Sequence, residues 1–385
     1  MSKTEIVVVG AGIAGLTSAA ILSKLGLSVT LIESHTQSGG CAGTFKRKRY
    51  IFDVGATQVA GLEEGGIHSK IFKFLDIPLP EASILNPACI VDLKDGSKPI
   101  PIWYDKDEWI KEREMQFPGS RQFWQLCNLI HQSNWTFANN NPVLPVKNFW
   151  DFSQLLTALV PTNLVTGILI KSTIFDLLRF CGLSNDERLI KFLNLQLKLY
   201  SQEDVYNTAA LYGSTVLQMC QKPHGLWHLK KSMQALSDAL EDSLKKRGVN
   251  IVFGQKVNSI NFDDVKKSWK VCASSKLEKM VYFADDVIYT PPPQSLLKHL
   301  KSPLDNTYNY KKRIQSLPDP SGALVFYSAL KKEHIKVISS NHYQFVSNEL
   351  GSLFVSISEE GDGSCLLYTS PSPRDLRRSR MPSSA

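Results

Sequence analysis

Three glycines at fixed spacing, with an acidic residue further on, carry the clearest chemical signal in this chain of 385 residues. Gly10, Gly12 and Gly15 directly follow one apolar run, and Glu33 ends a second apolar run. A glycine turn between a buried strand and a helix allows a diphosphate to approach the backbone, where the helix N-terminus offers N–H groups and positive charge. The spacing therefore predicts a dinucleotide-binding site.

Each residue of this motif has its own physical role. Gly10 permits the tight turn, Gly12 leaves room for a pyrophosphate, and Gly15 lets the helix lie close to the strand. Glu33 is expected to accept hydrogen bonds from ribose hydroxyls, and its charge argues against a 2′-phosphate and hence against NADP. The alternative is a glycine turn in an ordinary α/β sheet, which this combination of strand, helix and acid disfavours.

The elements that position these residues can be read from the hydrophobic pattern. The runs at 6–9 and 29–32 predict strands buried on both faces, and the stretch 13–24 predicts a helix that stops at Gly26. A later apolar stripe from Leu229 to Leu244 predicts a second helix. The fold class expected from this order is α/β, with a three-layer, mostly parallel Rossmann-like sheet.

A second diglycine loop separates the two common dinucleotides. Gly39 and Gly40 come soon after Glu33, and two stretches of backbone can then flank one long diphosphate. An NAD site does not need this second loop, so the sequence favours FAD.

With this loop the chain resembles the flavoprotein superfamily of phytoene desaturases, carotene isomerases and amine oxidases. The resemblance implies contacts to ribose and pyrophosphate from Glu33, Gly39, Gly40 and Thr44, and an approach to the flavin ring by a segment that begins at Asp53. It also implies that the backbone of Val257 meets the adenine and that a strand ending near Thr290 returns to the dinucleotide domain. The full expected cofactor set is Gly10, Gly12, Ile13, Ala14, Gly15, Glu33, Ser34, Gly39, Gly40, Thr44, Gly55, Ala56, Thr57, Val257 and Thr290.

Longer stretches narrow the resemblance to one branch of this family. Segments 52–68, 116–120, 196–202 and 225–229 are similar to cyanobacterial carotenoid C-3′,4′ desaturases that act in myxol synthesis. The resemblance implies an FAD-dependent oxidoreductase that desaturates the end group of a monocyclic carotenoid. Two alternatives remain: a carotene cis–trans isomerase that uses reduced FAD, and a prenyl-binding chaperone of the GDP-dissociation-inhibitor type that uses none.

The sequence assigns no catalytic residue. Glu63, Glu64 and His68 follow the flavin-proximal segment and could act as bases, although exposed loop side chains are the simpler interpretation. Seven scattered cysteines lack metal-ligand spacing, so a reduced compartment and no metal are expected. The net charge of +8 comes from dispersed lysines, which favours a membrane surface over nucleic acid as a partner.

The middle of the chain is rich in aromatic residues, which could together line a tunnel for a long apolar substrate. Residues 152–170 contain no charged side chain but are interrupted by polar groups and Pro161. This pattern predicts a segment that lies in a membrane interface or is buried in the protein. The expected localisation is peripheral, on the cytoplasmic side of a thylakoid or plasma membrane.

The expected domains are discontinuous. Residues 1–66 and 221–298 form the FAD-binding domain, and 67–220 with 299–363 form an inserted mixed α+β substrate domain. Residues 364–385 are rich in Ser, Pro and Arg, and are expected to be a disordered, non-native tail. The family's final glycine-rich segment is missing, so a C-terminally truncated fold is expected, which binds FAD weakly or folds incompletely.

Overall fold

The computed structural model describes residues 4–48, 50–301, 307–317, 324–329, 340–347, 351–358 and 364–369. Its contacts divide the chain into two compact units. Unit 1 comprises Met1–Ser83, Trp227–Pro320 and Glu359–Ser364. Unit 2 comprises Ile84–Leu226, Ser321–Ser358 and Cys365–Ala385.

Unit 1 is built on a six-stranded sheet in the order β10-β2-β1-β13-β12-β11. Strands β10, β2, β1 and β13 are parallel to one another. Strand β12 pairs antiparallel with both β13 and β11. The strands are β1 Thr4–Val9, β2 Val29–Ile32, β10 Asn250–Val252, β11 Lys256–Asp263, β12 Ser268–Ser274 and β13 Lys279–Tyr289.

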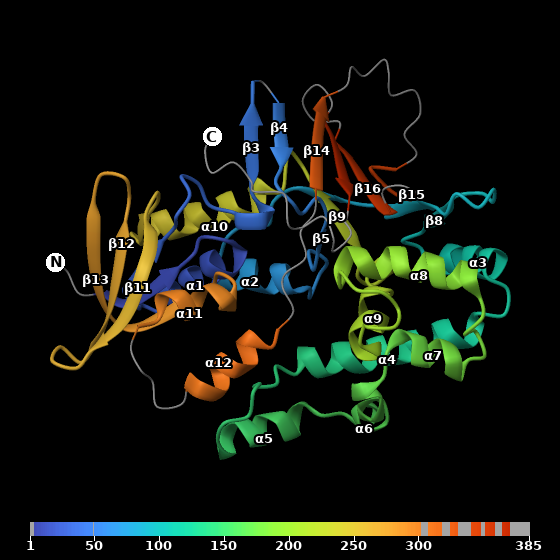
Figure 1. Cartoon of the computed structure of the whole chain (residues 1–385), viewed down its shortest axis with the longest axis horizontal. Coiled ribbons are helices and arrows are strands. Elements are labelled where there is room, and N and C mark those ends of the chain that lie inside the picture. Colours follow the sequence, from blue (N-terminus) through green and yellow to red (C-terminus); the bar gives the residue numbers. More distant parts are fainter. Residues whose placement is uncertain are drawn as a thin grey trace. The chain divides into compact units, whose positions relative to one another are not determined.

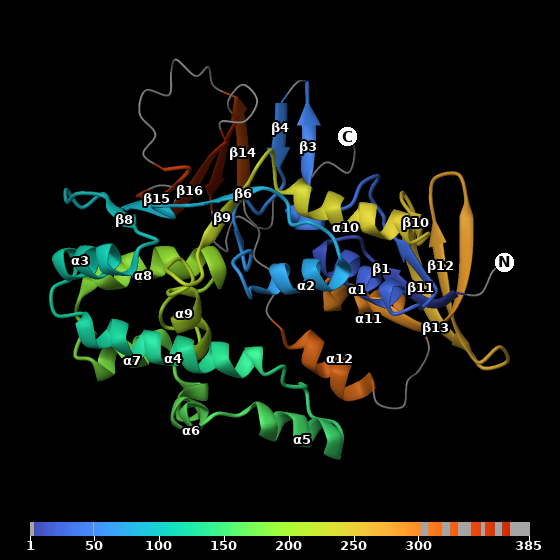
Figure 2. The same cartoon turned by 180° about the vertical axis from the view of Figure 1, so that it is seen from behind.

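Apolar residues cover both faces of this sheet. Val8 and Leu31 belong to the cluster that contains the helices α1 (Ile13–Lys24), α2 (Ile67–Leu75) and α10 (Gln234–Lys246). Val7 and Ile32 belong to a second cluster, against which α11 (Pro293–His299) packs through Leu296. Because neighbouring strand residues point to opposite faces, fully apolar strands are the expected result. The predicted three-layer Rossmann-like fold is confirmed, and Figures 1 and 2 show α1 and α10 side by side.

Smaller elements complete unit 1. The hairpin of β3 (Thr44–Arg47) and β4 (Tyr50–Asp53) follows the short 3-10 helix η1 (Gly40–Ala42). Helix α12 spans Thr307–Gln315. The second helix begins later than its apolar stripe suggested, because Leu229 ends strand β9 (Leu226–Leu229), which pairs with β5 (Val59–Ala60) and β6 (Ala82–Ile84). Leu229 still packs in the same core as Leu244.

Unit 2 combines helices with a second six-stranded sheet, ordered β14-β17-β16-β15-β7-β8. Its strands are β7 Cys89–Asp92, β8 Ile100–Ile102, β14 Leu324–Ala329, β15 His342–Ser347, β16 Gly351–Ser358 and β17 Ser364–Thr369. Its helices are α3 Lys106–Gln116, α4 Arg121–Asn139, α5 Phe149–Ala158, α6 Pro161–Gly167, η2 Ile168–Lys171, α7 Ile174–Phe180, α8 Glu187–Tyr200 and α9 Ala210–Val216.

Some aromatic residues of unit 2 are fully buried and others are strongly exposed, while Trp103 and Trp135 are half-buried. Trp109 and Trp124 are buried and their rings pack 5.9 Å apart, while Phe123 lies 5.2 Å from Trp124. Phe149 and Trp150 are 84% and 62% exposed. The prediction of a lining for a tunnel is therefore wrong for these residues, because the buried rings fill the core by contacting one another and the others face outward.

The bounds of the compact units differ from the expected domains. Unit 1 runs on from residue 66 to residue 83, because Phe72 and Leu75 of α2 pack in its core. The second segment of unit 1 spans residues 227–320, whereas the sequence predicts 221–298 for the second segment of the FAD-binding domain. Residues 364–369 form β17 where the sequence predicts disorder, which agrees with their apolar run Cys-Leu-Leu-Tyr. The rest of the predicted tail, 370–385, lies outside the described residues.

Candidate dinucleotide site

The first glycine turn lies between β1 and α1 and tolerates no side chain at two positions. Gly10 has φ of +97°, and a Cβ there would lie 2.7 Å from Oγ1 of Thr290. A Cβ on Gly15 would lie 1.8 Å from the carbonyl oxygen of Gly10. Thr290 closes the turn from the end of β13, since its N–H and its hydroxyl both donate to the Val9 carbonyl, at 3.0 and 2.8 Å.

Gly12 differs from its two neighbouring glycines because the space beside it is open. A Cβ on Gly12 would meet no atom within 4 Å among the described residues. Gly12 caps α1, and no side-chain hydrogen bond closes that helix end. The first-turn residues Ile13 and Ala14 are half-buried and exposed, respectively. The helix terminus therefore presents N–H groups beside a gap of the kind that a phosphate requires.

The second glycine loop packs directly on the first. The N–H of Gly39 donates to the carbonyl of Ala11 at 2.8 Å, and Gly39 forms a β-bridge with Gly12. A Cβ on Gly40 would lie 3.2 Å from the Cα of Gly12. Gly39 and Gly40 have φ of +118° and +58°, which favours glycine at both positions. The structure thus brings the two predicted loops together.

Glu33 joins the same loops through its carboxylate. Its Oε2 accepts the N–H of Ala11 at 2.6 Å, and its Oε1 accepts the Ser34 hydroxyl at 3.0 Å and the His35 N–H at 2.8 Å. Glu33 is only 9% exposed. A carboxylate oxygen can accept more than one hydrogen bond, so Oε2 retains capacity for a ribose hydroxyl.

Helix α10 holds the second loop in place through a residue that the sequence analysis missed. Oε1 of Gln234 accepts the N–H of Thr44 at 3.1 Å, and its Nε2 donates to the Ser38 carbonyl at 3.1 Å. Ser38 also donates its hydroxyl to Glu241. Because about 190 residues separate these partners, no local pattern could have identified Gln234.

The segment after β4 lies against the second loop. The N–H of Ala56 donates to the Cys41 carbonyl at 3.0 Å, and a Cβ on Gly55 would approach the same oxygen to 3.1 Å. Thr57 is half-buried. Asp53 accepts the N–H of Met233 at 3.0 Å, and burial raises the pKa of this carboxyl to about 6 although that hydrogen bond lowers it.

The chain leaving β10 runs along Glu33. The N–H of Gln255 donates to the Glu33 carbonyl and that of Gly254 donates to the His35 carbonyl, both at 2.9 Å. Within the described part of the chain, Oε1 of Gln255 is buried and has no hydrogen-bond partner. Val257 follows two residues later, with its side chain in the sheet core and its backbone at a register shift. Gln255 therefore offers a polar atom where an adenosine is expected.

These residues fit an adenine dinucleotide. The open space beside Gly12 suits a pyrophosphate, the spare capacity of Glu33 suits a ribose, and the unpartnered Gln255 oxygen suits an amino group. All of them belong to unit 1. When FAD is bound at such a site, it supplies an acceptor or donor for hydride that no side chain can replace.

Titratable groups outside the site include the three suggested bases. Glu64 is exposed, whereas Glu63 and His68 are half-buried. Burial lowers the pKa of His68 and the Glu63 charge raises it, with burial the larger effect. In unit 2, the rings of His131 and His224 lie 5.0 Å apart, and burial lowers the pKa of His131 to about 4. The described residues contain no group of three or more potential metal ligands.

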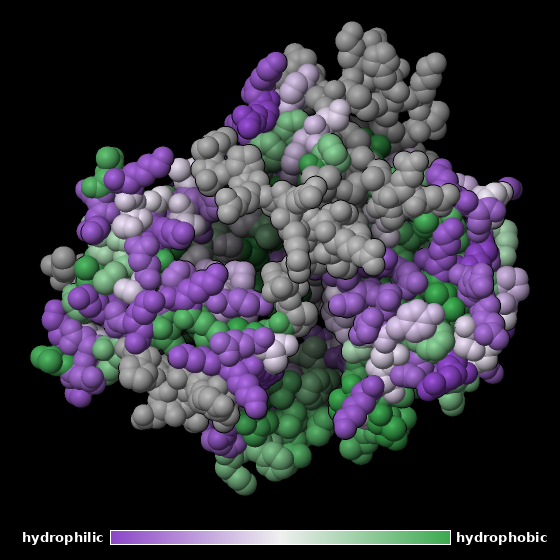
Figure 3. All heavy atoms as spheres, in the orientation of Figure 1, coloured by the Kyte–Doolittle hydropathy of each residue, from purple (hydrophilic) through white to green (hydrophobic). Residues whose placement is uncertain are grey.

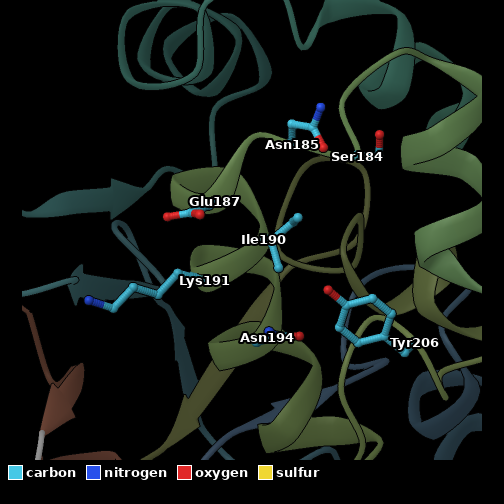
Figure 4. Close-up of a pocket in the computed structure, with 7 residues that line it drawn as sticks. All are labelled: Ser184, Asn185, Glu187, Ile190, Lys191, Asn194 and Tyr206. Atoms are coloured by element: carbon cyan, nitrogen blue, oxygen red, sulfur yellow. The ribbon is translucent and has the colours of Figure 1, made fainter.

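One pocket of unit 2 has a volume of about 490 Å³ (Figure 4). It lies along α8, and its polar wall includes Glu187, Lys191 and Asn194. Asn194 is already engaged, because its Oδ1 accepts the Val205 N–H at 2.9 Å. This pocket shares no residue with the dinucleotide site.

A family profile described as an NAD(P)-binding Rossmann-like domain matches residues 8–76. All-trans-retinol 13,14-reductase from Rattus norvegicus is 23% identical over 362 residues, which cover 90% of this chain and 58% of that protein. 4,4′-diapolycopene oxygenase from Methylomonas sp is 24% identical, with 88% and 68% covered. Prolycopene isomerase 2 from an Oncidium hybrid cultivar is 24% identical, with 68% and 44% covered.

Solved structures with the same fold include an oxidoreductase from Methanosarcina mazei, with a TM-score of 0.64, 16% identity, and 97% and 80% of the two chains covered. Putrescine oxidase has a TM-score of 0.63 at 14% identity, with 99% and 78% covered. A fatty acid isomerase from P. acnes has a TM-score of 0.61 at 15% identity, with 98% and 81% covered. Together these findings show that the chain shares the fold of these structures, and that its curated relatives are named for reductase, oxygenase and isomerase activities.

Proposed function

We propose that this protein is an FAD-dependent carotenoid desaturase that forms the C-3′,4′ double bond in the end group of a monocyclic carotenoid of the myxol type. The observation that carries the cofactor assignment is the meeting of Gly12, Gly40 and Glu33 at one place in unit 1. The carotenoid substrate is inferred from relatives named for diapolycopene and prolycopene. The position of the double bond rests on the branch-specific sequence stretches alone.

The chain's own residues would bind and orient the cofactor. The α1 N-terminus and the two glycine loops would hold the pyrophosphate, and Glu33 would orient the ribose. Desaturation also releases a proton from the neighbouring carbon. Glu63 and His68 are the half-buried candidates for accepting it, whereas the exposed Glu64 would be solvated.

Two relatives support a second candidate activity. Prolycopene isomerase and the fatty acid isomerase are named for reactions without net oxidation. A cis–trans isomerase would use the same dinucleotide site with reduced FAD. The chaperone alternative has no such support, because the glycine loops and Glu33 provide a site for a cofactor that it would not bind.

The test is product analysis in a host that accumulates a monocyclic carotenoid, with expression of this chain as the only change. Desaturation predicts a product two mass units lighter with an absorption shift to longer wavelength. Unchanged mass with a new retention time would identify the isomerase instead. A product two mass units heavier would indicate reduction, the direction named for the retinol relative, and would contradict the proposal.

A further inference from the structure

The helices α5 and α6 with η2 have their polar and apolar sides reversed relative to an ordinary surface helix. On α5, Phe149, Phe152 and Leu156 are 84%, 45% and 53% exposed. On α6 and η2, Leu164 and Ile168 are 72% and 81% exposed. Residues three and four apart lie on one helix face, so each helix presents an apolar face outward. Figure 3 shows hydrophobic side chains gathered over these two helices.

Two polar residues of α6, Asn163 and Thr166, point inward and are satisfied there, whereas Thr157 and Thr162 are exposed. Asn163 donates its Nδ2 to the hydroxyl of Ser133 on α4 at 2.7 Å, and Ser133 also contacts the Thr166 hydroxyl at 3.0 Å. Nδ2 of Asn140 donates to the Ala158 carbonyl at 3.0 Å. These contacts hold the helices against α4 by their polar side, which leaves the apolar side free of any partner among the described residues.

Charge marks the two ends of this surface. Lys147 and Lys171 flank it, are exposed, and form no ion pair within the described part of the chain. The single acidic residue between them is Asp151, which is 7% exposed. Its carboxylate accepts the N–H of Lys147, and its own N–H donates to Oδ1 of Asn148, the N-cap residue of α5. The apolar face is therefore bordered by positive charge that no carboxylate on that face offsets.

The bend between α5 and the α6–η2 segment determines how this surface could contact a membrane. No single helix among the described residues is long and apolar enough to cross a bilayer, and the pair Phe149–Ala158 with Pro161–Lys171 is bent by 100°. A pair bent this sharply does not form one straight span. Short amphipathic helices of this kind can lie along a membrane surface with their apolar faces at the boundary between headgroups and acyl chains.

We propose that this face, formed by the outward residues of α5, α6 and η2, docks on a bilayer that contains anionic lipids. The large apolar side chains enter the acyl boundary, and Lys147 and Lys171 bind the anionic headgroups. A second copy of the chain fits less well, because a two-fold contact through this face would bring the same lysines together without an acidic partner. The proposal does not depend on which reaction the enzyme catalyses.

Vesicle flotation of the full chain tests the proposal. The unaltered protein should float with vesicles of phosphatidylcholine and phosphatidylglycerol. Leu156→Glu with Ile168→Glu should weaken binding at least tenfold, whereas the matched pair Val265→Glu with Leu277→Glu, which alters exposed residues of unit 1, should not. Lys147→Gln with Lys171→Gln should weaken it about fivefold for each lysine, on anionic vesicles only. Lys98→Gln with Lys276→Gln is the charge-matched control.

Two further measurements keep the result unambiguous. Lipids brominated in their acyl chains should quench part of the tryptophan fluorescence of the unaltered chain, and Trp150→Phe should remove that part. Sedimentation without lipid should give the same mass for the unaltered chain and the glutamate variant. Absence of flotation and quenching would overturn the proposal, as would a dimer that the glutamate pair dissociates.

Discussion

The dinucleotide cradle is formed by residues 10–15, 33 and 39–44, and the α5–α6 face is formed by the outward residues of α5, α6 and η2. The two regions place their polar groups differently. The cradle leaves backbone N–H groups and one carboxylate beside an open space, as at Gly12 and Glu33. The α5–α6 face turns Asn163 and Thr166 toward α4 and exposes large apolar side chains. Polar groups facing a gap indicate a charged ligand, whereas exposed apolar groups indicate a hydrophobic surface.

The comparison also separates two kinds of glycine and two kinds of leucine. Gly15 is required by packing, because it lacks space for a Cβ, whereas Gly12 has that space and is proposed to be required by the cofactor. Leu229 stabilises a core, whereas Leu164 contributes little to folding in water because it is 72% exposed. Substitutions that change stability or cofactor binding can test both differences.

The largest effect is expected for Gly15→Ala. Its new Cβ would lie 1.8 Å from the Gly10 carbonyl oxygen, so β1 and α1 would have to separate. We expect a loss of more than about 3 kcal/mol in the free energy of unfolding, measured by denaturant titration. Gly167→Ala is the control, because no described atom lies within 4 Å of its Cβ position, and it should be neutral. Equal stability of the two variants would contradict the packing role of Gly15.

The next largest effect concerns Asp53 and depends on pH. Its folded pKa of about 6 exceeds the ordinary value of 3.8, so the native state binds the proton more tightly than the unfolded chain does. Stability from this group is therefore present at low pH and is lost as pH rises from about 4 through 6. Asp53→Asn keeps an acceptor for the Met233 N–H without the charge, and should be up to about 3 kcal/mol more stable at pH 8.

The pH series provides the control for this prediction. At pH 4 the Asp53→Asn variant and the unaltered chain should unfold at nearly the same denaturant concentration, and the difference should grow up to pH 6. Asp264→Asn, at an exposed turn position, should show no such growth. A constant difference at every pH would mean that Asp53 is not protonated on folding.

A smaller pair of effects tests the reversed polarity of α6. Asn163→Ala removes hydrogen bonds to Ser133 and to the N–H of Val160, and should lower the free energy of unfolding by about 1–2 kcal/mol. Leu164→Ser, one position further along, should change it by less than about 0.5 kcal/mol. Thermal unfolding of both variants measures this. A larger loss for Leu164→Ser would show that the apolar side of α6 is covered in the folded chain.

The first βαβ segment could be predicted from sequence, although its first strand begins at Thr4 instead of the expected residue 6. The helix expected at 13–24 and the strand at 29–32 coincide with α1 and β2. This success has a local cause, since a doubly buried strand, a glycine turn and a helix stop each follow from neighbouring residues. For the same reason the two glycine loops and Glu33 were identified together.

What the sequence missed depends on contacts between distant residues. Gln234 reaches Thr44 across the chain, and Gln255 takes its importance from lying against Glu33. Burial was equally hard to predict, because aromatic residues of similar composition became a packed core at Trp124 and an exposed face at Phe149. Periodicity gives the face of a helix but does not say whether that face meets the core or the surroundings.

The central claim is that the two glycine loops hold an FAD pyrophosphate beside Gly12. A fluorescence titration of FAD into the unaltered chain, Gly12→Ala and Gly167→Ala tests it most directly. A Cβ at Gly12 occupies the space intended for phosphate without touching the protein, so Gly12→Ala should fold normally and bind FAD at least about tenfold more weakly. Equal affinities for all three proteins, with equal unfolding temperatures, would contradict the account.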